Sequence, residues 1–129
     1  MPLSKAFPTS LDTVGDHIRA ARLQRGLEQG EVARILGVTE STVWNWENYR
    51  SSPPIHQCKL VIEFIGYDPF PKPATFSEQL VSFRRKRGLR VRDAAALAGV
   101  DPASWSSWER GEHKIKEDYR NRIRALLNS

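Results

Sequence analysis

The stretch ILGVTESTVWNWE, residues 35–47, returns 62 residues later as LAGVDPASWSSWE, residues 97–109. Both stretches contain a Gly-Val pair followed, after seven residues, by a Trp-Glu pair. The same offset aligns residues 22–47 with residues 84–109 without a gap, and nine of the 26 aligned positions are identical. Repetition at a fixed offset indicates that the chain contains two copies of one structural unit.

Apolar spacing and capping residues predict that both copies are helical. Apolar residues follow a spacing of four and then three over residues 14–21 and again over 76–83, which is one helix face. The segments TVGD, residues 13–16, and TFSE, residues 75–78, fit the capping box at a helix start. We expect helices over residues 14–25, 29–36, 40–48 and after Pro53-Pro54, then over 76–87, 91–98, 102–109 and around Tyr119 and Ile123.

Proline content and the repeat together predict the domain organisation. Three prolines lie within residues 66–75, which favours a semi-stiff linker. The expected parts are an N-terminal tail over 1–11, a first domain over 12–66, the linker over 67–75 and a second domain over 76–129.

Composition restricts the function classes. The single cysteine, Cys58, excludes an internal disulfide and a cysteine-based metal site, and its apolar helix face predicts a buried filler. His17, His56 and His113 are scattered without metal-ligand spacing. We find no signal peptide, membrane span, nucleophile–base set or phosphate-binding loop in the sequence, so we expect a cytoplasmic protein that is not an enzyme and uses no cofactor.

The net charge of +5 is confined to the second half of the chain. Residues 1–66 contain seven basic and seven acidic residues, whereas residues 67–129 contain thirteen and eight. The densest basic run is RRKRGLRVR, residues 84–92. Such a run is either a solvated helix face or a surface that attracts a polyanion.

The two repeated segments resemble a known family. RLQRGLEQGEVARILGVTESTVWNWE, residues 22–47, and FRRKRGLRVRDAAALAGVDPASWSSWERGE, residues 83–112, are similar to the lambda-repressor-like helix-turn-helix regulators of the Cro/CI (XRE) type. The second segment has the family's Glu-Arg-Gly ending, which the first replaces with Glu47-Asn48-Tyr49. The resemblance implies an all-α fold of two tandem helix-turn-helix domains, each with four or five helices.

In such a fold, the third helix of each copy lies in the DNA major groove, where every base pair presents its own donors and acceptors. The resemblance implies base contacts at Glu40, Ser41 and Asn45, and a phosphate contact at Gln29. For Glu40, stabilisation of the helix N-terminus is the alternative. The candidate DNA-binding residues of the first copy are Gln29, Thr39, Glu40, Ser41, Thr42, Trp44, Asn45, Asn48 and Arg50.

The second copy presents a different surface. Val91, Pro102, Ala103 and Ser107 stand where the first copy has Gln29, Glu40, Ser41 and Asn45, and they are poor readers of base edges. Its basic residues favour phosphate contact, which positions a protein without carrying sequence information, and a pairing surface is the alternative role of this copy. The candidate DNA-binding residues of this copy are Arg85, Lys86, Arg90, Arg92, Ser104, Ser107, Arg110 and Lys114.

Five further residues have expected structural roles. The resemblance implies one ion pair between Arg22 and Glu47 and another between Arg84 and Glu109. Trp44 is expected to pack on the helix below or on Tyr49, with contact to DNA or a partner chain as the alternative.

The leading function is a double-stranded-DNA-binding transcription regulator of the repressor-like family, with homodimerisation possible and no membrane or small-molecule ligand expected. A protein-interaction module, such as an antitoxin or a mobile-element accessory protein, is the first alternative. RNA binding through the basic second copy is the second alternative.

Overall fold

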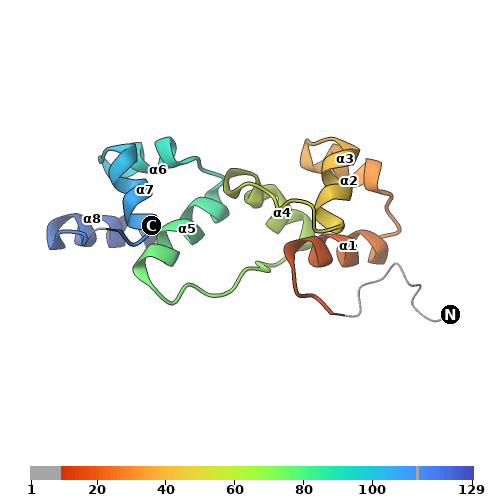
Figure 1. Ribbon diagram of the computed structural model, residues 1–129, viewed down its shortest axis with the longest axis horizontal. Helices are drawn as coiled ribbons and strands as arrows, with labels where there is room; N and C mark the ends of the chain where they lie inside the picture. The colour runs from red at the N-terminus through yellow and green to blue at the C-terminus, as the bar shows by residue number, and fades with distance from the viewer. Residues whose placement is uncertain (1–9, 113) are drawn as a thin grey trace. The chain divides into compact units, whose positions relative to one another are not determined.

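The computed structural model describes residues 10–112 and 114–129, and these residues form α-helices and one short 3-10 helix without any strand (Figure 1). The predicted all-α fold class is confirmed. Residues 1–9 of the predicted tail and His113 lie outside the described residues. The chain divides into two compact units. Unit 1 contains the described residues up to Pro54 and Leu60–Phe70, and unit 2 contains Ile55–Lys59 and Pro71–Ser129.

The helices follow the repeat. Their bounds are α1 Val14–Gln24, α2 Gln29–Leu36, α3 Glu40–Glu47, η1 Ile55–Gln57, α4 Cys58–Ile65, α5 Phe76–Arg87, α6 Val91–Ala98, α7 Pro102–Glu109 and α8 Glu117–Leu127. Four predicted helices, over 29–36, 76–87, 91–98 and 102–109, agree with α2, α5, α6 and α7 residue by residue. The predictions for α1 and α3 are each one residue too long at the C-terminal end.

Local signals explain where these helices begin and end. The Thr13 hydroxyl accepts a hydrogen bond from the backbone N–H of Asp16, and the Asp16 carboxylate accepts one from the N–H of Thr13, which completes a capping box at α1. Gly37 and Gly99 end α2 and α6 with φ of 69° and 68°, a conformation that is costly for residues with a Cβ.

Each unit has its own hydrophobic core. In unit 1, Val43 and Trp46 of α3 are buried against α1 and α2, as predicted. Cys58, at the start of α4 and grouped with unit 2, is also buried as predicted. In unit 2, Trp105 of α7 is fully buried in contact with Phe83. The third helix of each copy, α3 or α7, therefore buries one face in the core and turns its other face outward.

Both expected ion pairs are present and bidentate. Nε and Nη2 of Arg22 each lie 2.8 Å from an oxygen of Glu47, whose exposed fraction is 2%. Nε and Nη2 of Arg84 each lie 2.6 Å from an oxygen of Glu109. These pairs join α1 to the end of α3 and α5 to the end of α7.

The ending of α3 departs from the repeat. Gly111 of unit 2 has a φ of 69°, and the aligned Tyr49 of unit 1 has a φ of 62° although it carries a side chain. The Tyr49 hydroxyl donates to Oδ1 of Asp16 over 2.5 Å, which holds the residue in this left-handed conformation. Unit 1 thus uses a hydrogen bond to α1 where unit 2 uses a glycine.

Candidate nucleic-acid interface

The turn between α2 and α3 places the outer face of α3 at the surface of unit 1. After Gly37, the backbone N–H of Val38 donates to the carbonyl of Ala33 over 2.9 Å. Thr39 then caps α3, because its hydroxyl accepts from the N–H of Thr42 over 3.2 Å. The Thr39 and Thr42 hydroxyls are also 2.8 Å apart. These two predicted DNA-binding residues are therefore hydrogen-bonded to each other at the start of α3.

Five of the predicted DNA-binding residues line one shallow depression of about 300 Å³ at the surface of unit 1. The depression is formed by one residue of α2 and one face of α3. These residues are Gln29, Glu40, Ser41, Trp44 and Asn45. An amide donor, a carboxylate, a hydroxyl and an indole are thereby presented together, which is the range of groups that read base edges in a groove.

The side chain of Gln29 is tied to the buried ion pair. Its Nε2 donates to Oε1 of Glu47 over 3.3 Å, and Nε of Arg19 lies 4.0 Å from the same oxygen. The predicted phosphate contact at Gln29 therefore belongs to a residue whose side chain is already oriented by Glu47. The Arg19 contact has no equivalent in unit 2, where the aligned residue is Val81.

Gly30 lies next to Glu40 of this site, and the sequence patterns did not reveal this proximity. A Cβ at Gly30 would lie 3.6 Å from a carboxylate oxygen of Glu40, which is an ordinary contact distance. Unit 2 has Arg92 at this position. A glycine within a helix costs about 1 kcal/mol relative to alanine.

The expected packing of Trp44 on the helix below or on Tyr49 stays a prediction. The Trp44 side chain is 45% exposed and Tyr49 is 63% exposed, and the Tyr49 hydroxyl is bound to Asp16. That hydrogen bond ties Tyr49 to α1. Trp44 is left as a large apolar group on the otherwise polar outer face of α3.

The other predicted contacts of unit 1 lie at the end of α3. Asn48 is exposed, and its side-chain amide donates to the carbonyl of Trp44 over 2.9 Å. Arg50 is exposed, and its backbone N–H donates to the carbonyl of Asn45 over 2.8 Å.

The outer face of α7 in unit 2 is short and weakly polar, as its sequence indicated. Pro102 and Ala103 are exposed and Ser104 is half-buried. Ser107 is 8% exposed with its hydroxyl enclosed, which removes it from the surface available to DNA. The aligned Asn45 of unit 1 reaches the depression instead.

The predicted basic contacts of unit 2 lie in separate places. Arg90 and Arg92 are exposed on either side of Val91, at the start of α6, and Arg92 lies 3.8 Å from Asp93. Arg110 is paired with Glu112 at 2.7 Å, which raises the pKa of the guanidinium. The remaining basic contacts are Arg85 and Lys86 on α5 and Lys114 after α7.

The described part of the chain offers neither a membrane-spanning helix nor a metal cluster. No helix there has the length and apolar character needed to cross a membrane. Across residues 10–112 and 114–129, no cluster of three or more His, Cys, Asp or Glu residues could hold a metal ion.

Comparison with known families agrees with this geometry. A helix-turn-helix family matches residues 18–70, and a helix-turn-helix domain family matches residues 75–128. The comparison with curated proteins and that with solved structures give no match. The two family matches follow each other along the chain and include all eight α-helices of the described residues except the first turn of α1. The chain belongs to the lambda-repressor-like helix-turn-helix family and carries two copies of its domain in tandem.

Proposed function

We propose that the chain is a sequence-specific, double-stranded-DNA-binding transcription regulator in which unit 1 reads the bases and unit 2 holds the phosphate backbone. The observation that carries the proposal is the depression on α3, where Gln29, Glu40, Ser41, Trp44 and Asn45 converge. Unit 2 belongs to the same family but lacks this set of side chains on α7.

In unit 1, α3 enters the major groove with its N-terminal half nearest to the bases. The Asn45 amide suits adenine, and the Glu40 carboxylate suits the amino group of cytosine. Gln29, at the start of α2, approaches a phosphate while Glu47 fixes its side chain. Trp44 supplies an apolar surface suited to a thymine methyl group.

In unit 2, the start of α6 is the part that suits the DNA backbone. Arg90 and Arg92 flank Val91, the residue aligned with Gln29, so two guanidinium groups stand where unit 1 has Glu28 and Gly30. The unpaired N–H groups at a helix start favour an anion, and cations beside them increase that preference. Phosphate contacts made there would strengthen binding to any duplex.

Binding isotherms test this division. A duplex selected from a random pool serves as the cognate site, and a scrambled duplex serves as the reference. Asn45→Ala should reduce the preference for the cognate duplex by about 1–3 kcal/mol and leave binding to the scrambled duplex nearly unchanged. Arg90→Gln with Arg92→Gln should weaken both complexes and flatten the dependence of log K on log salt by roughly 0.9 per lost phosphate contact.

A charge-matched control separates local contacts from net charge. Lys72→Gln with Arg122→Gln removes two positive charges from the same half of the chain, one in the linker and one on α8 beside Gly99, at the opposite end of α6 from Arg90 and Arg92. This control should retain most of the affinity and the salt slope. If the control weakens binding as much as the α6 variant, unit 2 acts only through its total charge. If no duplex is selected at all, the proposed DNA-binding function is wrong.

Regulation itself requires a second readout. A promoter reporter that carries the selected duplex should respond to the wild-type chain and not to Asn45→Ala. A fall in reporter output identifies a repressor, and a rise identifies an activator. Sedimentation of the protein with and without the duplex establishes whether one chain or a homodimer occupies the site.

A further inference from the structure

The depression on unit 1 contains a carboxylate without a local counter-charge. Over residues 10–112 and 114–129, no basic side chain lies within ion-pair distance of the Glu40 carboxylate. Gly30 of α2 lies beside this carboxylate and has no side chain that could donate to it, whereas the aligned residue of unit 2 is Arg92. An ionised carboxylate only accepts hydrogen bonds, so a ligand that enters the depression must bring a donor to Glu40 or leave it unpaired.

An apolar ring lies one helical turn away from this carboxylate. Trp44 follows Glu40 by four residues, so both side chains are on the same face of α3, and both line the depression. The Trp44 side chain is 45% exposed, although indoles are usually buried. The depression therefore presents a hydrogen-bond acceptor and an apolar surface to the same ligand.

The combination of Glu40 and Trp44 is specific to unit 1. At the 62-residue offset, unit 2 has Pro102 and Ser106 in their place. The helices α3 and α7 nevertheless have the same length, and each buries a Trp at the same aligned position. Neither Glu40 nor Trp44 is thus needed to build the fold, which leaves both available for recognition.

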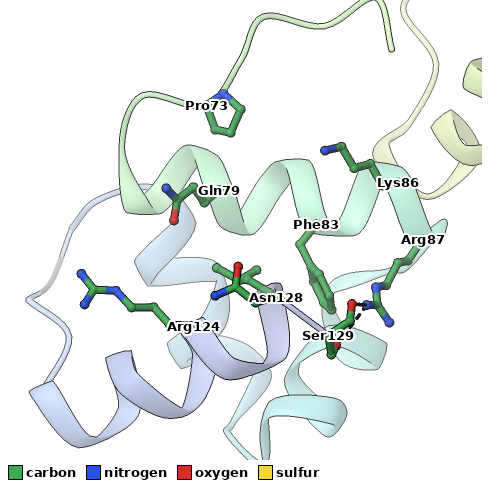
Figure 2. A pocket seen from close by; sticks show the side chains of 9 residues that line it. Pro73, Gln79, Phe83, Lys86, Arg87, Arg124, Asn128 and Ser129 are labelled. Atoms are coloured by element: carbon green, nitrogen blue, oxygen red, sulfur yellow. Dashed lines mark hydrogen bonds between the residues drawn. The ribbon is translucent and has the colours of Figure 1, made fainter. Parts of the chain in front are cut away.

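A larger cleft in unit 2 shows no comparable convergence of side chains. It has a volume of about 510 Å³ and lies between α5 and the end of α8 (Figure 2). Its basic side chains, Lys86, Arg87 and Arg124, point in different directions in Figure 2. Nη2 of Arg87 already donates to the carbonyl of Ser129 over 2.8 Å. The smaller depression of unit 1 is therefore the site whose side chains select a ligand.

We propose that the Glu40–Trp44 pair recognises 5-methylcytosine in duplex DNA, an inference that rests on the proposed function of unit 1. In the major groove, cytosine presents the amino group on C4 as a donor. The methyl group of 5-methylcytosine is on the adjacent carbon, C5, and projects into the same groove. Glu40 accepts from the amino group, and Trp44 covers the methyl group.

The pair distinguishes three pyrimidines because it tests two features of the base. Cytosine has the amino group without the methyl group, and thymine has the methyl group with an acceptor, O4, in place of the amino group. Each of them therefore satisfies one member of the pair. With thymine, the Glu40 carboxylate also faces an acceptor, so thymine should be rejected more strongly than unmethylated cytosine.

Binding isotherms with modified duplexes test this inference. The contacted position is the C·G pair of the selected duplex at which replacement by T·A raises the Kd of wild type about tenfold or more. The same replacement should matter much less to Glu40→Gln, because a glutamine amide both accepts and donates. At this position, 5-methylcytosine should lower the Kd of wild type about fourfold relative to cytosine, as expected for the burial of one methyl group.

Variants at Trp44 identify the group that covers the methyl. Trp44→Ala should bind the cytosine and 5-methylcytosine duplexes equally, and should still prefer cytosine to thymine. Trp44→Leu keeps an apolar group at the position and should retain part of the preference for the methylated duplex. The NMR signal of the Trp46 indole, which is buried in the core of unit 1, verifies that each variant is folded.

Two controls separate this contact from general effects. Ile35→Ala removes another exposed apolar side chain of unit 1, on α2 and outside the depression, and should retain the fourfold preference. A 5-methylcytosine placed outside the selected site should leave the Kd unchanged, which controls for an effect of methylation on the stiffness of the duplex.

Three results would overturn the inference and leave the proposed function in place. The first is an equal Kd of wild type for the cytosine and 5-methylcytosine duplexes at every C·G pair of the selected site. The second is a methyl preference that persists in Trp44→Ala. The third is a loss on replacement of C·G by T·A that is the same in Glu40→Gln as in wild type. Failure to select any duplex would instead overturn the proposed function and this inference together.

Discussion

The indole Nε1 of Trp105 donates a hydrogen bond to Oε2 of Glu109 over 2.6 Å, within the same helix. In unit 1 the residue aligned with Trp105 is Val43, which has no donor, and the carboxylate of Glu47 accepts from Gln29 instead. The two copies therefore keep one ion pair but complete its hydrogen bonding differently. In unit 1 the additional donor comes from the candidate interface, whereas in unit 2 it comes from the core.

Removal of Glu47 should destabilise unit 1 severely. Glu47→Ala leaves Arg22, whose side chain is 12% exposed, without a counter-charge, and an unpaired buried charge costs about 3–5 kcal/mol. The indole N–H signals of Trp44 and Trp46, followed by NMR during urea denaturation, should report this loss. Trp105 and Trp108 should report an unchanged unit 2.

The exposed ion pair of Arg110 and Glu112 is the control for that experiment. Both side chains are half or more exposed, so Glu112→Ala should leave the denaturation midpoint of unit 2 nearly unchanged. Equal losses in Glu47→Ala and Glu112→Ala would contradict the distinction between buried and exposed pairs.

Trp105→Phe should destabilise unit 2 and leave unit 1 intact. The substitution keeps an aromatic ring in the core but removes the N–H that Glu109 accepts, which costs about 1.5–3 kcal/mol for a bond to a charged group. Urea denaturation followed by NMR at the backbone amides of α7 measures the change. Trp108→Phe, at a ring that packs against Tyr119, controls for the loss of indole volume and should cost less.

The sequence predicted what depends on neighbouring residues and missed what depends on distant contacts. The bounds of α2, α5, α6 and α7 follow from caps, prolines and glycines that act within a few residues. The left-handed Tyr49 depends on Asp16, which lies 33 residues earlier, and turn propensities would have placed glycine there.

The sequence predicted which residues of the candidate site share a helix face, but it did not predict which of the aligned side chains reach the surface. Helical spacing placed Glu40, Ser41 and Asn45 on one outer face, and the structure brings them together. Spacing alone also placed Ser107 outward at the position of Asn45, yet its small side chain is enclosed in unit 2. Whether a side chain reaches the surface depends on its length and on the helices around it, and the repeat carries no information on either.

The bond between Tyr49 and Asp16 should make the stability of unit 1 depend on pH. Burial acts to raise the pKa of Asp16, but hydrogen bonds from the Tyr49 hydroxyl and the Thr13 and Asp12 backbone outweigh it and lower the pKa below 3.8. The carboxylate therefore stabilises the fold above its ordinary pKa, and this contribution is lost as pH falls through the lowered value. Thermal unfolding of unit 1 between pH 2 and pH 6 should show a steeper acid decline in wild type than in Asp16→Asn.

The pKa of Tyr49 predicts that the stability of unit 1 also falls at alkaline pH. Its hydrogen bond to Asp16 raises its pKa above 10.0, so the contribution is complete below that pH and is lost as pH rises through the raised value. Tyr49→Phe should remove this alkaline decline. Parallel alkaline profiles for wild type and Tyr49→Phe would show that the bond does not form in solution.

Two glycines of unit 1 should respond in opposite ways to alanine. A Cβ at Gly15 would lie 2.0 Å from the carbonyl oxygen of Trp46, where α1 meets α3. Backbone cannot yield as a side chain does, so Gly15→Ala should separate the helices and destabilise unit 1 by about 1–3 kcal/mol despite alanine's higher helix propensity. The aligned residue of unit 2 is Ser77, whose hydroxyl donates to the Trp108 carbonyl over 2.6 Å. In unit 2 a hydrogen bond therefore joins α5 to α7 at the point where Gly15 allows α1 and α3 of unit 1 to touch.

Gly30 provides the matched substitution in the same unit. A Cβ there would meet only the Glu40 carboxylate, at the ordinary contact distance of 3.6 Å. Gly30→Ala should therefore be neutral or raise stability by up to about 1 kcal/mol, because alanine favours the helix. Urea denaturation of both variants, read from the Trp46 indole, makes the comparison. A stabilised Gly15→Ala would show that α1 and α3 do not approach as closely as the structure places them.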